Sequence, residues 1–220
     1  FVVIALAFSL ALRMALFRYH GYSVDESTFT SWYNTAAEKG LRGFYDNTWS
    51  DYPPLNAYIF WIFGKLSQAL GPGSLNILLK LPQNLFDLAT AFLIFRFMRL
   101  RYRYLFALGA MAVYALNPAT IFNLAVWGQM DSVYTFFMVA SLYAAIRSKH
   151  ELSAGLLGLA ILTKPQSIVL LPVVAYLILR NGGWKRALTS SAVFIALIFL
   201  VIAPFRWDNP VTFLIDRYSG

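Results

Sequence analysis

Apolar stretches separated by short polar links run along most of the chain. They cover residues 1–17, 81–98, 104–116, 132–146, 152–162, 168–179 and 187–204. Several are shorter than the roughly 20 residues of a full membrane span, so we expect them to borrow flanking polar residues or to lie inside a bundle. The pattern predicts an all-α integral membrane protein with about seven transmembrane helices.

Two further segments show a helical repeat with a polar opposite face. In residues 54–70 the apolar positions at helical spacing are Leu55, Ile59, Phe63, Leu66 and Leu70. In residues 24–39 they are Phe29, Trp32, Tyr33, Ala36 and Ala37. We expect both segments to be helices that lie flat on the outer membrane surface. Ser23 and Glu26 predict a capping box at the start of 24–39, and Gly40 predicts its end.

The composition supports this class and excludes others. Hydrophobic residues make up 59% of the chain and charged residues 13%, which leaves too little polar surface for a water-soluble globule. No cysteine is present, so disulfides and thiolate metal sites are excluded. Nothing resembles a cleavable signal peptide, and we expect the chain to be a fragment because it stops just after a polar loop begins.

The formal net charge of +8 comes from basic residues at the ends of the apolar stretches. Because these residues do not follow one face, they indicate membrane topology and no nucleic-acid partner. Three clusters, within residues 96–103, 147–149 and 180–186, should face the cytoplasm by the positive-inside rule. Between these clusters the chain must cross the membrane and return twice. This places the turns at residues 117–131 and 163–166 on the outer face, where residues 205–210 also lie.

The acidic residues are distributed in the opposite way. Residues 18–77 are predicted to form the first outer loop, and this loop holds half of the ten carboxylates, namely Asp25, Glu26, Glu38, Asp46 and Asp51. The other outer carboxylates on this topology are Asp131, Asp208 and Asp216, while Asp87 lies within the membrane and Glu151 in the cytoplasm.

This asymmetry has two explanations. Outer loops can simply carry the acids that inner loops avoid. Alternatively, the acids belong to an active site, because Asp25, Asp51 and Asp131 come from three loops that can meet only around one outer cavity. The distribution of charge by itself leaves both explanations open.

Four motifs occur in a fixed order: DE at Asp25, DYPPL at Asp51, NPA…WGQMDS from Asn117 and LTKPQ from Leu162. This set resembles the GT-C fold glycosyltransferases that use polyprenyl-phosphate sugars, such as the dolichyl-phosphate-glucose- and dolichyl-phosphate-mannose-dependent transferases and their bacterial and archaeal relatives. The resemblance implies one GT-C-like transmembrane module over residues 1–220, with juxtamembrane helices at 24–39 and 54–70. Family members continue into further spans, so we expect a C-terminal continuation that this chain lacks.

The resemblance also implies a reaction. A hexose would move from a polyprenyl-phosphate donor to a lipid-linked glycan or another outer-face acceptor, with inversion and with Asp25 as the general base. Lys164, and less strongly Arg206, would hold the donor phosphate. The residues expected to bind substrate are Glu26, Asp51, Tyr52, Pro53, Pro54, Trp127, Gln129, Asp131, Lys164, Gln166 and Arg206. A snorkelling lysine and interfacial aromatic residues are the alternative interpretations of this set.

Metal dependence stays open at this stage. We expect no obligatory metal or cofactor, although Asp25, Glu26 and Asp131 could hold a divalent cation through oxygen ligands. His20 and His150 are predicted on opposite sides of the membrane, so no histidine cluster supports zinc. Asp87 needs a partner within the membrane, and Lys80, about two turns away, is the predicted one.

Two other function classes remain possible from sequence. A transporter or lipid-sugar flippase would move its substrate without covalent chemistry, but such proteins tend to contain internal repeats and midplane sites, and neither is visible here. A purely structural membrane subunit would not need the converging carboxylates. Flux of a labelled substrate without covalent transfer would favour the transporter.

Overall fold

The computed structural model describes residues 1–206 and residue 213, and these residues form helices and links without a strand. Asp208 and Asp216, predicted to face outward, lie outside the described residues. The helices in chain order are α1 (Val2–Leu16), α2 (Ser23–Asn47), α3 (Pro54–Leu70), α4 (Leu75–Met98), α5 (Tyr104–Ala115), α6 (Pro118–Ile121), α7 (Asp131–Ile146), α8 (His150–Ile161) and α9 (Leu171–Ile202). A π-helical segment, Phe122–Trp127, continues α6, and short 3₁₀ segments occupy Pro72–Ser74 and Pro165–Leu170.

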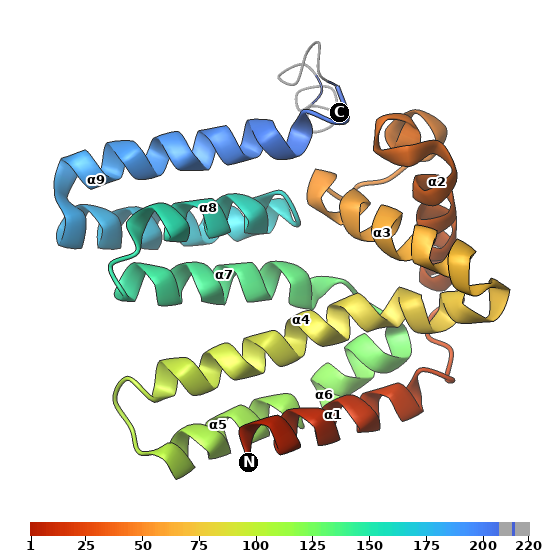
Figure 1. Ribbon diagram of the computed structural model, residues 1–220, viewed down its shortest axis with the longest axis horizontal. Coiled ribbons are helices and arrows are strands. Elements are labelled where there is room, and N and C mark those ends of the chain that lie inside the picture. Colours follow the sequence, from red (N-terminus) through yellow and green to blue (C-terminus); the bar gives the residue numbers. More distant parts are fainter. Residues whose placement is uncertain (207–212, 214–220) are drawn as a thin grey trace.

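The apolar helices lie side by side, and α2 and α3 cross one end of this bundle (Figure 1). In the bundle α4 packs against α5 and α7, α7 against α8, and α8 against α9. We call the end that carries α2 and α3 the acidic end. The opposite end, called the basic end, carries the 99–103 and 147–149 links and the bend of α9 (Figure 1). The three basic clusters therefore share one end, as predicted.

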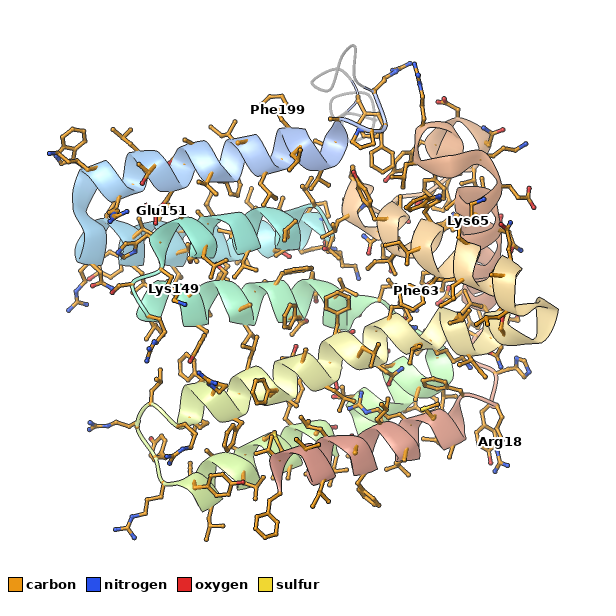
Figure 2. The ribbon with its side chains drawn as sticks, in the orientation of Figure 1. Arg18, Phe63, Lys65, Lys149, Glu151 and Phe199 are labelled. Carbon is orange, nitrogen blue, oxygen red and sulfur yellow. The ribbon has the colours of Figure 1, made fainter. Side chains whose placement is uncertain are left out.

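Each end also carries charges of the other sign. Figure 2 shows Lys149 and Glu151 at the basic end and Arg18 and Lys65 at the acidic end. Glu151 accepts a hydrogen bond from Arg186 at 2.8 Å, which ties the start of α8 to the second half of α9. The link between α7 and α8 is thus held beside the bend of α9.

The number of membrane spans is smaller than predicted when it is judged by length and composition. Two of the described helical stretches are long and apolar enough to cross a membrane, Leu75–Met98 and Pro165–Ile202. A third candidate is the pair Tyr104–Ala115 and Pro118–Trp127, which is bent by 44°. Three apolar helices are shorter: Val2–Leu16, Asp131–Ile146 and His150–Ile161. The chain is an integral membrane protein, but a count of seven spans is not confirmed.

The longest candidate span is not straight. α9 breaks at Gly183, whose φ of 69° and ψ of −176° lie in a region that only glycine adopts without strain. Figure 1 shows the helix folding back at this point, at the basic end. The sequence predicted two separate apolar stretches here, 168–179 and 187–204, and the bend at Gly183 lies between them.

Both segments predicted to be juxtamembrane form helices. α3 has the predicted bounds, Pro54–Leu70, and Pro54 occupies its first turn, where a missing N–H costs nothing. α2 begins at Ser23 and breaks at Gly40, but it resumes and continues to Asn47. Its predicted apolar stripe is buried against α3, with the Trp32 and Phe60 rings 5.6 Å apart.

The capping box at the start of α2 is wrong. The residue before the helix is Tyr22, and no side chain caps the helix there. Glu26 instead lies 2.8 Å from His20 Nδ1, on the link that precedes the helix. A histidine ring six residues earlier competes successfully for the carboxylate, because the link folds back beside the first turn.

One face of α4 is polar and buried. It carries Lys80, Gln83, Asn84 and Asp87, which are between 0% and 3% exposed. α4 begins at Leu75, earlier than the predicted start at 81, and it runs through Pro82 without stopping. The spacing of these four residues places them on one side of the helix, so the polar face turns toward its neighbours rather than toward lipid.

The predicted pairing of Asp87 with Lys80 is wrong. Its carboxylate accepts hydrogen bonds from Arg13 of α1 at 2.7 Å and from the Tyr114 hydroxyl of α5 at 2.8 Å. Lys80 lies farther toward the acidic end, where it donates to the carbonyl oxygens of Phe17 and Tyr19. Lys80 is on the same helix as Asp87, but tertiary packing brings Arg13 of another helix closer to the carboxylate.

The orientation of the bundle can be tested by cysteine labelling, since the chain has no cysteine of its own. Asn47 and Gln68 are exposed at the acidic end, and Tyr102 is exposed at the basic end. We expect an impermeant thiol reagent to label Asn47→Cys and Gln68→Cys in intact cells, and Tyr102→Cys only after permeabilisation. Labelling of Asn47→Cys solely from the cytoplasmic side would reverse the predicted topology.

The buried ion pair between Arg13 and Asp87 predicts how single and double substitutions change the free energy of unfolding. Asp87→Leu leaves Arg13 charged and buried, so the free energy of unfolding should fall by about 3–5 kcal/mol. Arg13→Leu/Asp87→Leu removes both charges and should lose less than Asp87→Leu alone. Thermal unfolding in detergent measures both. A double variant less stable than either single variant would contradict a charge-based role.

Candidate functional site

Asp25, in the first turn of α2, is held by side chains that lie far away in sequence. Its Oδ2 atom accepts hydrogen bonds from Trp127 Nε1 at 2.8 Å and from Gln129 Nε2 at 2.7 Å. Asp25 is half-buried, and among the described residues its other oxygen, Oδ1, has no hydrogen-bond partner. The first acidic loop and the 117–131 loop therefore meet at this carboxylate.

The backbone of the 117–131 loop is arranged to present these two donors. Asn117 caps α6 by accepting the N–H of Ala119 at 2.9 Å. The N–H groups of Gly128 and Gln129 both donate to the Asn123 carbonyl at 3.1 Å. Gly128 has a φ of 86°, so the chain turns sharply between the tryptophan and the glutamine.

The polar face of α4 holds the 117–131 loop by hydrogen bonds. Gln83 Nε2 donates to the Gly128 carbonyl at 3.0 Å, and Asn84 Nδ2 donates to the Leu124 carbonyl at 3.0 Å. Ser132 donates in turn to the Gln83 carbonyl at 2.6 Å. Side-chain amides thus satisfy backbone groups that would be costly to bury unpaired.

The link into α2 is pressed against the same loop. A Cβ atom at Gly21 would lie 2.6 Å from the Cα of Trp127, so no larger residue fits there without moving the backbone. Lys80 holds the Tyr19 carbonyl two residues earlier, at 2.5 Å. These contacts fix the distance between α2 and Trp127 and so the position of Asp25.

A second group of side chains surrounds Lys164. Its ammonium group forms an ion pair with Asp131, and both side chains are partly exposed. The Tyr52 and Tyr134 rings lie 5.8 Å and 5.6 Å from Lys164 Nζ, within range of a cation–π interaction. Asp131 is in the first turn of α7, where the helix dipole also favours a negative charge.

Proline residues shape the two turns that carry this group. Pro165 favours the extended backbone of Lys164, and Pro54 that of Pro53. The turns are clamped to each other, since the Leu55 N–H donates to the Leu162 carbonyl at 3.0 Å and Asn56 Nδ2 donates to the Thr163 carbonyl at 2.6 Å. Between them lies a cavity of about 280 Å³ lined by Asp51, Tyr52, Pro53, Lys164, Pro165 and Gln166.

Tyr52 connects the two groups electrostatically. Burial raises the pKa of its hydroxyl, and the charges of Asp131, Asp51 and Asp25 raise this pKa further, in that order. The three carboxylates come from three separate loops, yet all act on one phenol. The three carboxylates predicted to converge therefore lie near enough to influence the pKa of one phenol, and Lys164 lies beside the same ring.

Two predicted substrate-binding residues lie outside this arrangement. Glu26 is next to Asp25 in sequence, but its carboxylate is bound to His20. Arg206 is exposed after α9 and does not line the cavity. Pro54 is buried as the first residue of α3, where it supports the turn.

Sequence reasoning missed several residues that shape the site. Tyr134 follows Asp131 by three positions on α7, so helical spacing could have placed it beside the same ligand. Asn56, Gln83 and Asn84 carry a weaker signal: each is an amide in an apolar helix, and such a residue needs a partner. The identity of those partners is not readable from spacing.

The described residues contain no group of three or more histidine or acidic side chains arranged to hold a metal ion. Asp25, Glu26 and Asp131, considered from sequence as possible oxygen ligands, form no such group among these residues. The directed interactions of Asp25 are with an indole and an amide, and those of Asp131 are with a lysine.

Comparison with known proteins gives one family. A family model described as dolichyl-phosphate-mannose-protein mannosyltransferase matches residues 51–207, which is more than half of the chain. The matched region contains the Asp51 turn, the 117–131 loop and Lys164, and it begins after Asp25. A search of the curated proteins matched none of them to this chain.

Proposed function

Because the chain belongs to the dolichyl-phosphate-mannose-protein mannosyltransferase family, whose members are membrane glycosyltransferases of the GT-C type, we propose that it transfers a hexose from a polyprenyl-phosphate donor. The acceptor is a lipid-linked glycan or another acceptor on the outer face of the membrane. Family membership favours this enzyme over the transporter or flippase considered from sequence. Membrane lipids surround both substrates.

The observation that carries the proposal is the setting of Asp25. Trp127 and Gln129 both donate to Oδ2, so this oxygen is held in place, while Oδ1 is left without a described partner. A carboxylate oriented in this way can accept a proton from a hydroxyl placed on its other oxygen. The donors come from backbone that α4 holds rigidly, which limits the motion of the base.

The reaction balances as a single displacement. The acceptor oxygen forms a bond to the anomeric carbon while the bond between that carbon and the phosphate oxygen breaks. The hydroxyl proton passes to Asp25, and the polyprenyl phosphate leaves with the bonding electrons. One displacement inverts the anomeric centre, and the transition state resembles the oxocarbenium ion of glycoside hydrolysis.

Lys164 supplies the cation for the leaving phosphate. It lies on the wall of the 280 Å³ cavity and is paired with Asp131, so an incoming phosphate competes for or shares its ammonium group. Asp51 and Gln166 line the same cavity and can hydrogen-bond sugar hydroxyls, and the Tyr52 ring suits the apolar face of a pyranose. We assign the donor sugar to this cavity and the acceptor to the Asp25 side.

Asp25→Asn tests the base. Its amide oxygen can still accept from Trp127 and Gln129, but the side chain cannot take a proton, so turnover should fall roughly 10²–10⁴-fold with donor binding nearly unchanged. Glu26→Gln is the matched control, because Glu26 bonds to exposed His20 and should keep most activity. The assay follows transfer of labelled hexose from a polyprenyl-phosphate donor in proteoliposomes. Normal transfer by Asp25→Asn would remove Asp25 from the mechanism.

Lys164→Gln tests the phosphate site. Loss of the cation should lower kcat/KM for the donor roughly 30- to 10³-fold, which corresponds to about 2–4 kcal/mol. Lys164→Arg should recover part of this loss because it restores the charge. Lys65→Gln, on the exposed face of α3, is the control and should leave kcat/KM unchanged. Unaltered donor kinetics in Lys164→Gln would return this lysine to an interfacial role.

A further inference from the structure

A second cavity lies at the basic end, on the opposite side of the bundle from the candidate site. It has a volume of about 350 Å³ and is formed between α4, α7 and the start of α8. Three cations line it, Arg96 from the end of α4 and Arg147 and Lys149 from the link after α7. Figure 2 shows Lys149 at this end of the molecule.

None of these three cations has a carboxylate partner among the described residues. Arg96, Arg147 and Lys149 are exposed and take part in no ion pair within residues 1–206. Glu151, the one carboxylate that the described chain places at this end, is bound instead by Arg186 at 2.8 Å and by the Thr189 hydroxyl at 2.8 Å. The cavity therefore concentrates positive charge that no carboxylate among the described residues neutralises.

Apart from Tyr143, the rest of the cavity is lined by apolar residues. Leu93 of α4, Phe136 of α7 and Leu156 of α8 contribute to its wall, and each lies deeper in its helix than the neighbouring cation. The cavity thus has a cationic rim and a hydrocarbon interior. That combination matches a molecule with an anionic head and an apolar tail, and it does not match a free inorganic anion, which would leave the apolar wall unused.

We propose that this cavity binds one anionic phospholipid, with its phosphate on Arg96, Arg147 and Lys149 and an acyl chain against Leu93, Phe136 and Leu156. Basic pockets between membrane helices recognise anionic headgroups because local charge and the apolar groove act together. By the positive-inside rule this end faces the cytoplasm, where anionic lipid is available. The bound lipid would fill the space between α4, α7 and α8, the helices that connect the two ends.

The 99–103 link provides a matched control. Arg101 and Arg103 carry the same charge at the same end, but they do not line the cavity. A general attraction of basic residues to an anionic surface predicts equal effects for both pairs. A lipid site predicts an effect only for the pair in the cavity.

The experiment compares Arg147→Gln/Lys149→Gln with Arg101→Gln/Arg103→Gln in nanodiscs of equal phosphatidylglycerol and phosphatidylcholine. Native mass spectrometry after mild delipidation counts the retained lipids. We expect one retained phosphatidylglycerol per chain, retention about 10- to 30-fold lower in Arg147→Gln/Lys149→Gln, and wild-type retention in the control. Labelling of Tyr102→Cys in each background checks that the orientation is unchanged.

Three outcomes would overturn the proposal. They are wild-type protein that retains both lipids equally, equal losses in the two double variants, and release of the retained lipid by millimolar inorganic phosphate. Release by inorganic phosphate would indicate a site that binds a phosphate group without an acyl chain. Arg96→Gln, from a different helix, repeats the test with one charge removed and should lower retention of phosphatidylglycerol by itself.

Discussion

The buried polar face of α4 is the constraint on which the rest of the structure depends. In a helix surrounded by hydrocarbon, each polar side chain must find a partner within the protein. Asp87 finds Arg13 and Tyr114, Lys80 finds the carbonyls after α1, and Gln83 finds the 117–131 loop. One helix thereby fixes the positions of α1, of α5 and of the loop that reaches Asp25.

The position of Asp25 follows from these attachments rather than from α2 itself. Lys80 holds the end of the link before α2, Gly21 lets that link touch Trp127, and Gln83 holds the turn after Trp127. Both sides of the hydrogen bonds to Asp25 are therefore anchored to the same helix. The ion pair of Lys164 is set separately, by the clamp between the two proline turns.

Charge divides the molecule along its length. At the acidic end, three carboxylates raise the pKa of Tyr52, and Lys164 forms an ion pair with one of them, Asp131. At the basic end, the three cations that line a cavity form no ion pair with a carboxylate of residues 1–206. The apolar helices between the two ends separate these two charged environments (Figure 1).

The sequence by itself determined the class of protein, the helix Pro54–Leu70, the division between the apolar stretches 168–179 and 187–204, and the motifs that meet at the site. It also determined that acids and basic clusters gather at opposite ends. These features depend on local periodicity, on proline and glycine backbone preferences and on the cost of moving charge across a membrane. Only the tertiary structure decided that Asp87 pairs with Arg13 and Glu26 with His20. Such pairs form between the groups that folding brings within about 3 Å of each other, and residue spacing along one helix does not contain that information.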